Sequence, residues 1–92
     1  MYYEQNEAIK QAIRQIERWI FASKQDRHPG IALLHSNYAV GDLDMLRQMY
    51  DDKMVLEVTG KNPLKLLREA TALQDKAQRE VMLYCPRLKI EV

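Results

Sequence analysis

The sequence predicts an all-α fold, a small antiparallel bundle of three long helices and one short helix. Whether a short extended C-terminal tail follows the bundle is left as an alternative. Apolar residues recur at steps of three and four along most of the chain, which is the spacing of one helix face. Only three Gly and three Pro interrupt the 92 residues, so the elements must be long. A chain of this length has room for one hydrophobic core, and we interpret residues 1–92 as a single domain.

The first long helix is predicted from about Glu4 to Lys24. Its apolar residues follow one stripe, and its charged residues follow the opposite side. Acidic residues near its start and a lysine near its end suit the helix dipole. The predicted stripe consists of Ile9, Ala12, Ile13, Ile16, Trp19 and Ile20.

The second long helix is predicted from Pro29 or Gly30 to Tyr50, because proline is favoured at the first position of a helix. Gly41 lies in its middle and is compatible with a kink, a break or the close approach of another helix. We predict one continuous helix. Its main apolar stripe is placed on Ile31, Leu34, Tyr38, Met45 and Met49, widened by Ala39, Leu43, Leu46 and Tyr50.

Residues 51–60 carry conflicting signals. Two valines and a threonine favour a strand. Asp51 or Asp52, however, suits a helix N-cap, and Gly60 suits the position just after a helix end. We predict a short helix and keep a strand as the alternative.

The last long helix is predicted from Pro63 to about Tyr84, with Asn62 as its N-cap and Pro86 after its end. Its stripe is Leu66, Ala70, Leu73, Ala77, Val81 and Tyr84, widened by Leu64 and Leu67. The tail, residues 87–92, alternates apolar and charged residues as a strand does. A lone strand would need a pairing partner.

Composition excludes some classes of function. Fourteen Lys and Arg balance thirteen Asp and Glu, so the net charge gives no argument for binding nucleic acid or an anionic membrane. The single cysteine, Cys85, excludes an intramolecular disulfide. No stretch approaches the roughly 18 apolar residues of a membrane span, and the N-terminus does not resemble a secretory signal. We therefore expect a cytoplasmic protein with no membrane association.

Few residues are candidates for chemistry. His35 and Asp42 share a helix face but lie about 10.5 Å apart along it, which is too far for a direct hydrogen bond. We interpret His35 as a partly buried residue bonded to a backbone or carboxylate group. Cys85 follows a helix C-terminus, where the dipole disfavours a thiolate, and is interpreted as a packing residue. No spacing typical of a metal site or of a nucleophile with its base is present, so we expect no enzyme and no cofactor.

Two basic groups are candidates for anion binding. Lys10, Arg14 and Arg18 form a row along the first helix, but glutamates stand beside it, which favours a solvated face. The short helix, the turn and the last helix around Gly60 are similar in layout to a helix-turn-helix, whose second helix enters the major groove of DNA. Its basic residues are Lys61, Lys65 and Arg68. Leucines dominate the first turns of the last helix and favour an ordinary hairpin, so nucleic-acid binding is the alternative hypothesis.

The favoured function is protein interaction. The chain contains five Met and five Tyr, residue types that adapt to partners or are enriched at interfaces. The end of the last helix is apolar all round, and a narrow stripe cannot bury all of it inside one small bundle. We expect a non-enzymatic domain that self-associates, with a homodimer favoured, or that binds another protein. The expected interface residues are Met82, Leu83 and Tyr84, with Met49 and Tyr50.

Overall fold

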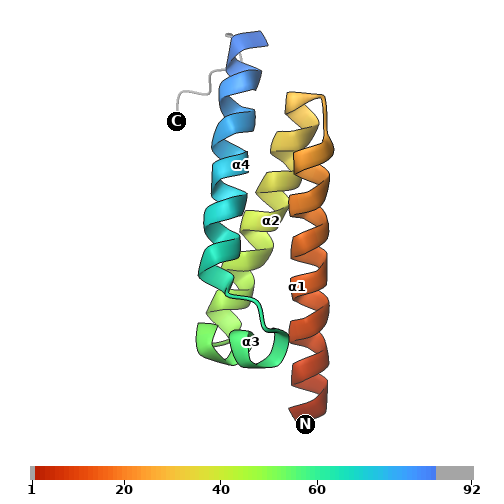
Figure 1. The fold of residues 1–92 in the computed structure, drawn as a ribbon, viewed down its shortest axis with the longest axis vertical. Helices are drawn as coiled ribbons and strands as arrows, with labels where there is room; N and C mark the ends of the chain where they lie inside the picture. Colours follow the sequence, from red (N-terminus) through yellow and green to blue (C-terminus); the bar gives the residue numbers. More distant parts are fainter. Residues whose placement is uncertain (1, 85–92) are drawn as a thin grey trace.

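The computed structural model describes residues 2–84, and it describes side chains from residue 4 onward. The elements are α1 (Tyr2–Gln25), α2 (Pro29–Met49), α3 (Asp52–Thr59) and α4 (Pro63–Tyr84). The three long helices run alternately up and down, and α3 crosses the lower end (Figure 1). The predicted all-α antiparallel bundle of three long helices and one short helix is confirmed. The predicted extended tail and Cys85 lie outside the described residues.

The helix ends follow the local signals in the sequence. Pro29 is the first residue of α2, and the preceding His28 is extended, with its Nδ1 accepting a hydrogen bond from the Gly30 N–H at 3.1 Å. Gly41 does not interrupt α2, so the prediction of a continuous helix is confirmed. His28 as a cap was not predicted.

The ambiguous segment before Gly60 is helical. Gly60 ends α3 with φ of 72°, a left-handed conformation that glycine adopts without strain. Asn62 then caps α4, because its Oδ1 accepts a hydrogen bond from the Leu64 N–H at 3.0 Å. Asp51 occupies the N-cap position of α3, but its side chain makes no capping hydrogen bond.

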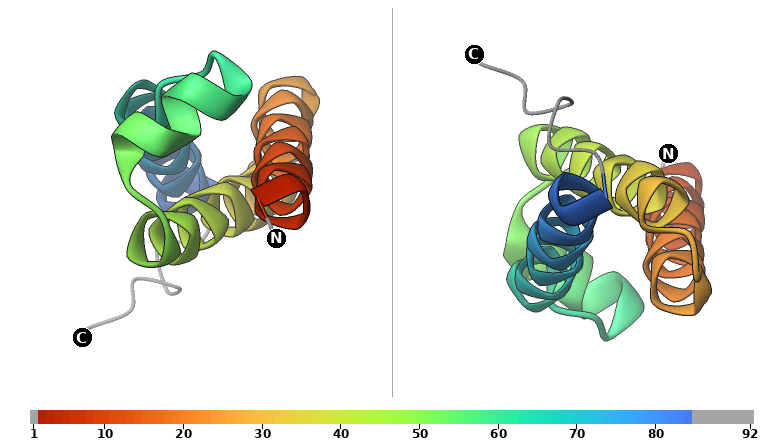
Figure 2. Two further views of the ribbon diagram at one scale, coloured as in Figure 1. Left: turned by 90° about the horizontal axis from the view of Figure 1, so that it is seen from below. Right: turned by 90° about the horizontal axis from the view of Figure 1, so that it is seen from above.

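The core lies around α2, which is the central helix. It packs against both α1 and α4, whereas α1 and α4 contact each other little (Figure 2). The predicted stripe of α1 is confirmed, since all four of its isoleucines are buried. The buried apolar residues of the other helices are Ala32, Ala39, Leu43 and Leu46 of α2, Val55 of α3, and Ala70 and Ala77 of α4.

The predicted main stripe of α2 is wrong. Its five large residues are between 45% and 64% exposed, and the residues predicted to widen the stripe form the buried side instead. The reason is steric. Because α2 is held between two other helices, it turns its small side chains, such as Ala32, Ser36 and Ala39, toward them, and this lets the helix axes approach closely.

The end of α4 also differs from the prediction. Tyr84 was assigned to the apolar stripe, but it is 78% exposed. α4 extends beyond the turn that joins α1 to α2, so its last residues have no helix opposite them (Figure 1).

Candidate interaction surface

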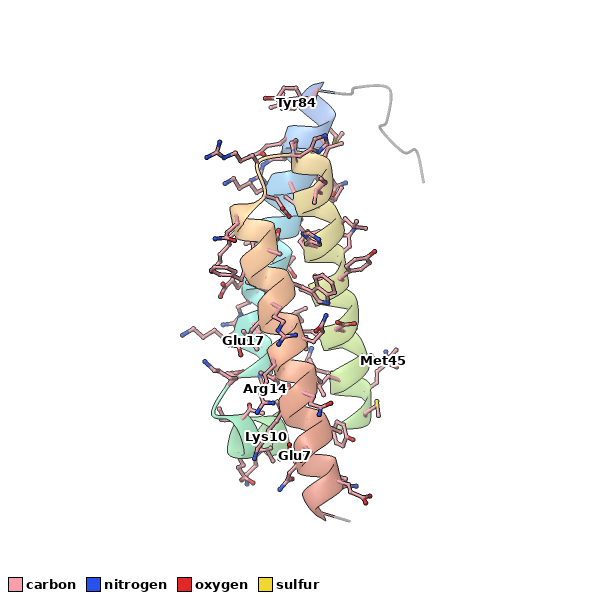
Figure 3. The ribbon with its side chains drawn as sticks, turned by 90° about the vertical axis from the view of Figure 1, so that its right-hand side faces the viewer. Glu7, Lys10, Arg14, Glu17, Met45 and Tyr84 are labelled. Carbon is pink, nitrogen blue, oxygen red and sulfur yellow. The ribbon has the colours of Figure 1, made fainter. Side chains whose placement is uncertain are left out.

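The most extensive exposed apolar feature of the described residues lies on α2, and we call it the outer face of α2. It consists of Ile31, Leu34, Tyr38, Met45 and Met49. These positions differ by three, four or seven residues, so they share one side of the helix. From the first to the last, the face extends about 27 Å, at about 1.5 Å per residue. Figure 3 shows Met45 pointing away from the rest of the bundle.

A shallow groove borders the lower half of this face. Its volume is about 220 Å³, and it lies between α1 and α2. Small or short side chains on α1 leave this space open. The lining residues that matter here are Ala8, Ala12 and Gln15 of α1 with Met45, Met49 and Tyr50 of α2.

An aromatic cluster borders the upper half. Trp19 of α1 stacks on His35 with ring centroids 5.4 Å apart. The centroid of the Tyr38 ring lies 5.0 Å from that of Trp19, with the two rings tilted. The Trp19 Nε1–H donates a hydrogen bond to Asp42 at 3.2 Å. These contacts join α1 to α2 and hold Tyr38 beside a fixed ring, so this part of the outer face is preorganised.

His35 confirms its predicted environment. Its Nδ1 lies 2.6 Å from a carboxylate oxygen of Asp26, and both side chains are 23% exposed. Trp19 stacks on His35 and donates a hydrogen bond to Asp42. His35 and Asp42 therefore do not contact each other, but both contact Trp19 and belong to one network with Asp26. This network joins the second half of α1 and the turn after it to α2.

The predicted interface residues lie in two separate places. Leu83 and Tyr84 are 80% and 78% exposed at the upper end of α4, and Met82 beside them is half-buried. Met49 is exposed and Tyr50 half-buried at the lower end of α2. Because α2 descends and α4 rises, the structure does not bring the two groups together (Figure 1). Met49 is the predicted residue that belongs to the outer face of α2.

Sequence reasoning missed the surface role of Ile31, Leu34, Tyr38 and Met45. Their spacing along the helix places them on one apolar stripe, which the sequence alone assigns to the core. A usable signal was present beside them. Ala32, Ser36 and Ala39 form a second, small-residue stripe, and such a stripe marks the side on which a helix approaches its neighbours.

The residues of the nucleic-acid alternative are only partly available. Lys65 and Arg68 are exposed on the first turns of α4. Lys61 lies in the turn before them, where its Nζ is 3.3 Å from a carboxylate oxygen of Glu17. The positive charge of Lys61 is therefore directed toward α1.

The cationic row of α1 is mixed with acidic residues. Lys10 lies 3.6 Å from Glu7, and Glu17 contacts Lys61 (Figure 3). Arg14 lies between these pairs on the same side of α1 (Figure 3). Such alternating charges describe a solvated helix face.

The charges around the outer face are unequal. The one Arg or Lys of α2 is Arg47, whose Nε and Nη2 donate hydrogen bonds to Asp52 at 3.0 and 3.1 Å. This hydrogen bonding raises the pKa of the Arg47 guanidinium above its ordinary value. Asp42 and Asp44 are exposed near the lower half of the face. Arg27, in contrast, is exposed in the turn that precedes α2.

The described residues offer neither a metal site nor a membrane-spanning helix. Within residues 2–84, His, Cys, Asp and Glu side chains do not gather in groups of three that could hold a metal ion. None of the four described helices combines the length and the apolar character needed to cross a membrane. Comparison of the chain with protein-family models, curated proteins and solved structures finds no match.

Proposed function

We propose that this chain is a non-enzymatic helical module that binds another protein through the outer face of α2. The single observation that carries this proposal is the line of five large apolar side chains exposed along one side of α2. An aromatic side chain has about 150–250 Å² of surface, and Ile, Leu and Met have somewhat less. Five such side chains that are about half exposed therefore leave on the order of 500 Å² facing water. Apolar patches of about 300–600 Å² on a monomer are often functional.

The composition of this face suits a protein partner. Its two methionines are flexible and adapt to irregular surfaces. Tyr38 is rigid by comparison, because it packs on Trp19. Rigid aromatic anchors with adaptable neighbours are typical of the centre of protein interfaces.

The nucleic-acid alternative has weaker support. Binding to DNA depends on several cations that contact phosphates together. The ion pair between Lys61 and Glu17 leaves Lys65 and Arg68 as the available cations of the predicted set. We therefore favour the protein-binding function.

The proposal is tested by measuring whether the outer face is covered in its native setting. A cysteine is introduced by Met45→Cys in a chain that also carries Cys85→Ser. The matched control is Gln78→Cys, at an exposed position on α4. The rate of thiol modification is measured in the cells that naturally make the protein and in dilute purified protein.

Protection of position 45 in cells, without protection of position 78, is the expected result. Both thiols are then expected to react at similar rates in the dilute purified protein, because the partner has dissociated. Equal reactivity of the two positions in cells would contradict a partner on this face.

A further inference from the structure

The spacing of residues along the outer face matches the contact line of one packed helix. Ile31, Leu34, Tyr38, Gly41 and Met45 follow steps of three, four, three and four. This alternation keeps contact residues on the side that faces a partner helix packed nearly in line with α2. The protein segment that fits along the outer face is therefore a helix about as long as α2.

Gly41 is a second sign of a helix that packs here. A glycine inside a helix costs about 1 kcal/mol relative to alanine. The fold itself does not require it, because a Cβ at this position would meet no atom within 4 Å and the backbone φ is not positive. A missing side chain in the middle of the contact line allows the backbone of a partner helix to approach closely.

The distribution of charge favours a second copy in the antiparallel direction. Asp42 and Asp44 lie toward the lower end of α2. Arg27 and the positive end of the helix dipole lie at the upper end, where the carboxylate of Asp26 is paired with His35. Two parallel copies would place these carboxylates against themselves. Two antiparallel copies place the carboxylates of each beside the first two turns of α2 in the other, and the two helix dipoles then also run in opposite directions, which is favourable.

The exposed area is sufficient for such a pair. A stable interface buries about 800 Å² on each partner. The outer face supplies on the order of 500 Å² of that from its five large side chains. A helix laid along the stripe also covers the polar residues on both of its flanks, and these supply the remainder.

We propose that the partner of the outer face is a second copy of this chain, packed antiparallel about a two-fold axis at Tyr38. The pairing is isologous, so each subunit presents the same surface. In this register Ile31 lies opposite Met45 of the partner subunit, because both are seven residues from the axis. The inference rests on the proposed protein-binding function and names its partner.

The first experiment measures the mass of the full chain in solution across a wide range of concentrations. We expect a reversible dimer whose dissociation constant rises about tenfold or more with Met45→Glu, because the charge is buried opposite an apolar residue. Leu83→Glu is the matched control, since Leu83 at the upper end of α4 is 80% exposed, more than Met45 at 64%, and lies outside the outer face. A dimer that is weakened by Leu83→Glu and unaffected by Met45→Glu overturns the proposal in favour of the end of α4.

A second experiment tests the direction of pairing. Chains with Ile31→Cys are mixed with chains with Met45→Cys, both in the Cys85→Ser background, and oxidised. Antiparallel packing forms the mixed disulfide between positions 31 and 45, whereas parallel packing forms only the two like-with-like disulfides. Predominance of the like-with-like products overturns the proposed geometry.

The two proposals fail in distinguishable ways. A purified chain that stays monomeric at all concentrations, while position 45 remains protected in cells, overturns the second copy and leaves a different protein as the partner. A chain that is monomeric and has no protection in cells overturns both proposals.

Discussion

The two sides of α2 differ in the size of their residues more than in their polarity. The buried side carries alanines, a serine and two leucines, whereas the exposed side carries Ile, Leu, Tyr and two Met. α1 shows the opposite arrangement, because its isoleucines face the core and its charges face solvent. In a central helix held between two others, the closeness of approach decides which side is buried. The larger apolar residues Ile31, Leu34, Tyr38, Met45 and Met49 then remain exposed to solvent.

The largest expected effect separates the two sides of α2 directly. Leu43 is fully buried, and Met45, two residues later on the same helix, is 64% exposed. Leu43→Ala should lower the free energy of unfolding by about 2–5 kcal/mol, because it leaves a cavity in the core. Met45→Ala should change it by less than about 0.5 kcal/mol. Urea denaturation of the dilute monomer measures both, and similar losses would contradict the assignment of the two sides.

A second prediction enlarges a buried side chain of α2 instead of shortening one. Ala39 is fully buried where α2 faces its neighbours. Ala39→Leu makes the helix more apolar, yet it should destabilise the fold by about 1–3 kcal/mol, because the added atoms force the helices apart. Ala72→Leu, at an exposed position of α4, is the control and should have little effect. Thermal unfolding of both variants is the measurement, and an unaltered midpoint for Ala39→Leu would show that size does not select the buried side.

The fold class was predictable because local signals and periodicity agree in most of the chain. The isoleucine stripe of α1 is unambiguous, and Gly60, Asn62 and Pro63 mark the end of one helix and the start of the next. Asp51 shows the limit of such signals. It stands at the N-cap position without forming the capping hydrogen bond that its type favours.

The exposed side of α2 was not predictable in the same way. α2 is apolar on two sides, so periodicity alone cannot say which one faces the core. That choice depends on how α1 and α4 pack against α2, and the periodicity of α2 alone does not contain this information. The prediction that the end of α4 is apolar and exposed holds for Leu83, whereas Tyr84 was predicted both in the buried stripe and at this end, and it is exposed. The distance of both residues from Met49 follows only from the opposite directions of α2 and α4.

Two buried serine hydroxyls give a third, smaller test of the close approach of α1 and α2. The Ser23 Oγ–H of α1 donates a hydrogen bond to the Ala32 carbonyl of α2 at 2.9 Å, which only a small residue at that contact permits. Ser23→Ala should cost about 1 kcal/mol, since it leaves a buried carbonyl lone pair without this donor. Ser36 donates within its own helix, to Leu33, so Ser36→Ala should cost less. Equal costs for the two serines in urea denaturation would argue against a specific bond between α1 and α2.

The smallest expected changes in the free energy of unfolding are those at Gly41 and Gly60, and Gly41 separates folding from association. Gly60→Ala should destabilise the fold by about 1 kcal/mol, because an alanine is strained at a φ of 72°. Gly41→Ala should stabilise the dilute monomer by about 0.5–1 kcal/mol, since the site is helical and open.

In the proposed dimer, however, the added methyl group of Gly41→Ala would stand between two closely packed helices. The same substitution should therefore weaken dimer formation while it raises the stability of the monomer. Thermal unfolding at low concentration and sedimentation at high concentration measure the two effects separately. A Gly41→Ala variant that improves both monomer stability and dimer formation would remove Gly41 from the proposed interface.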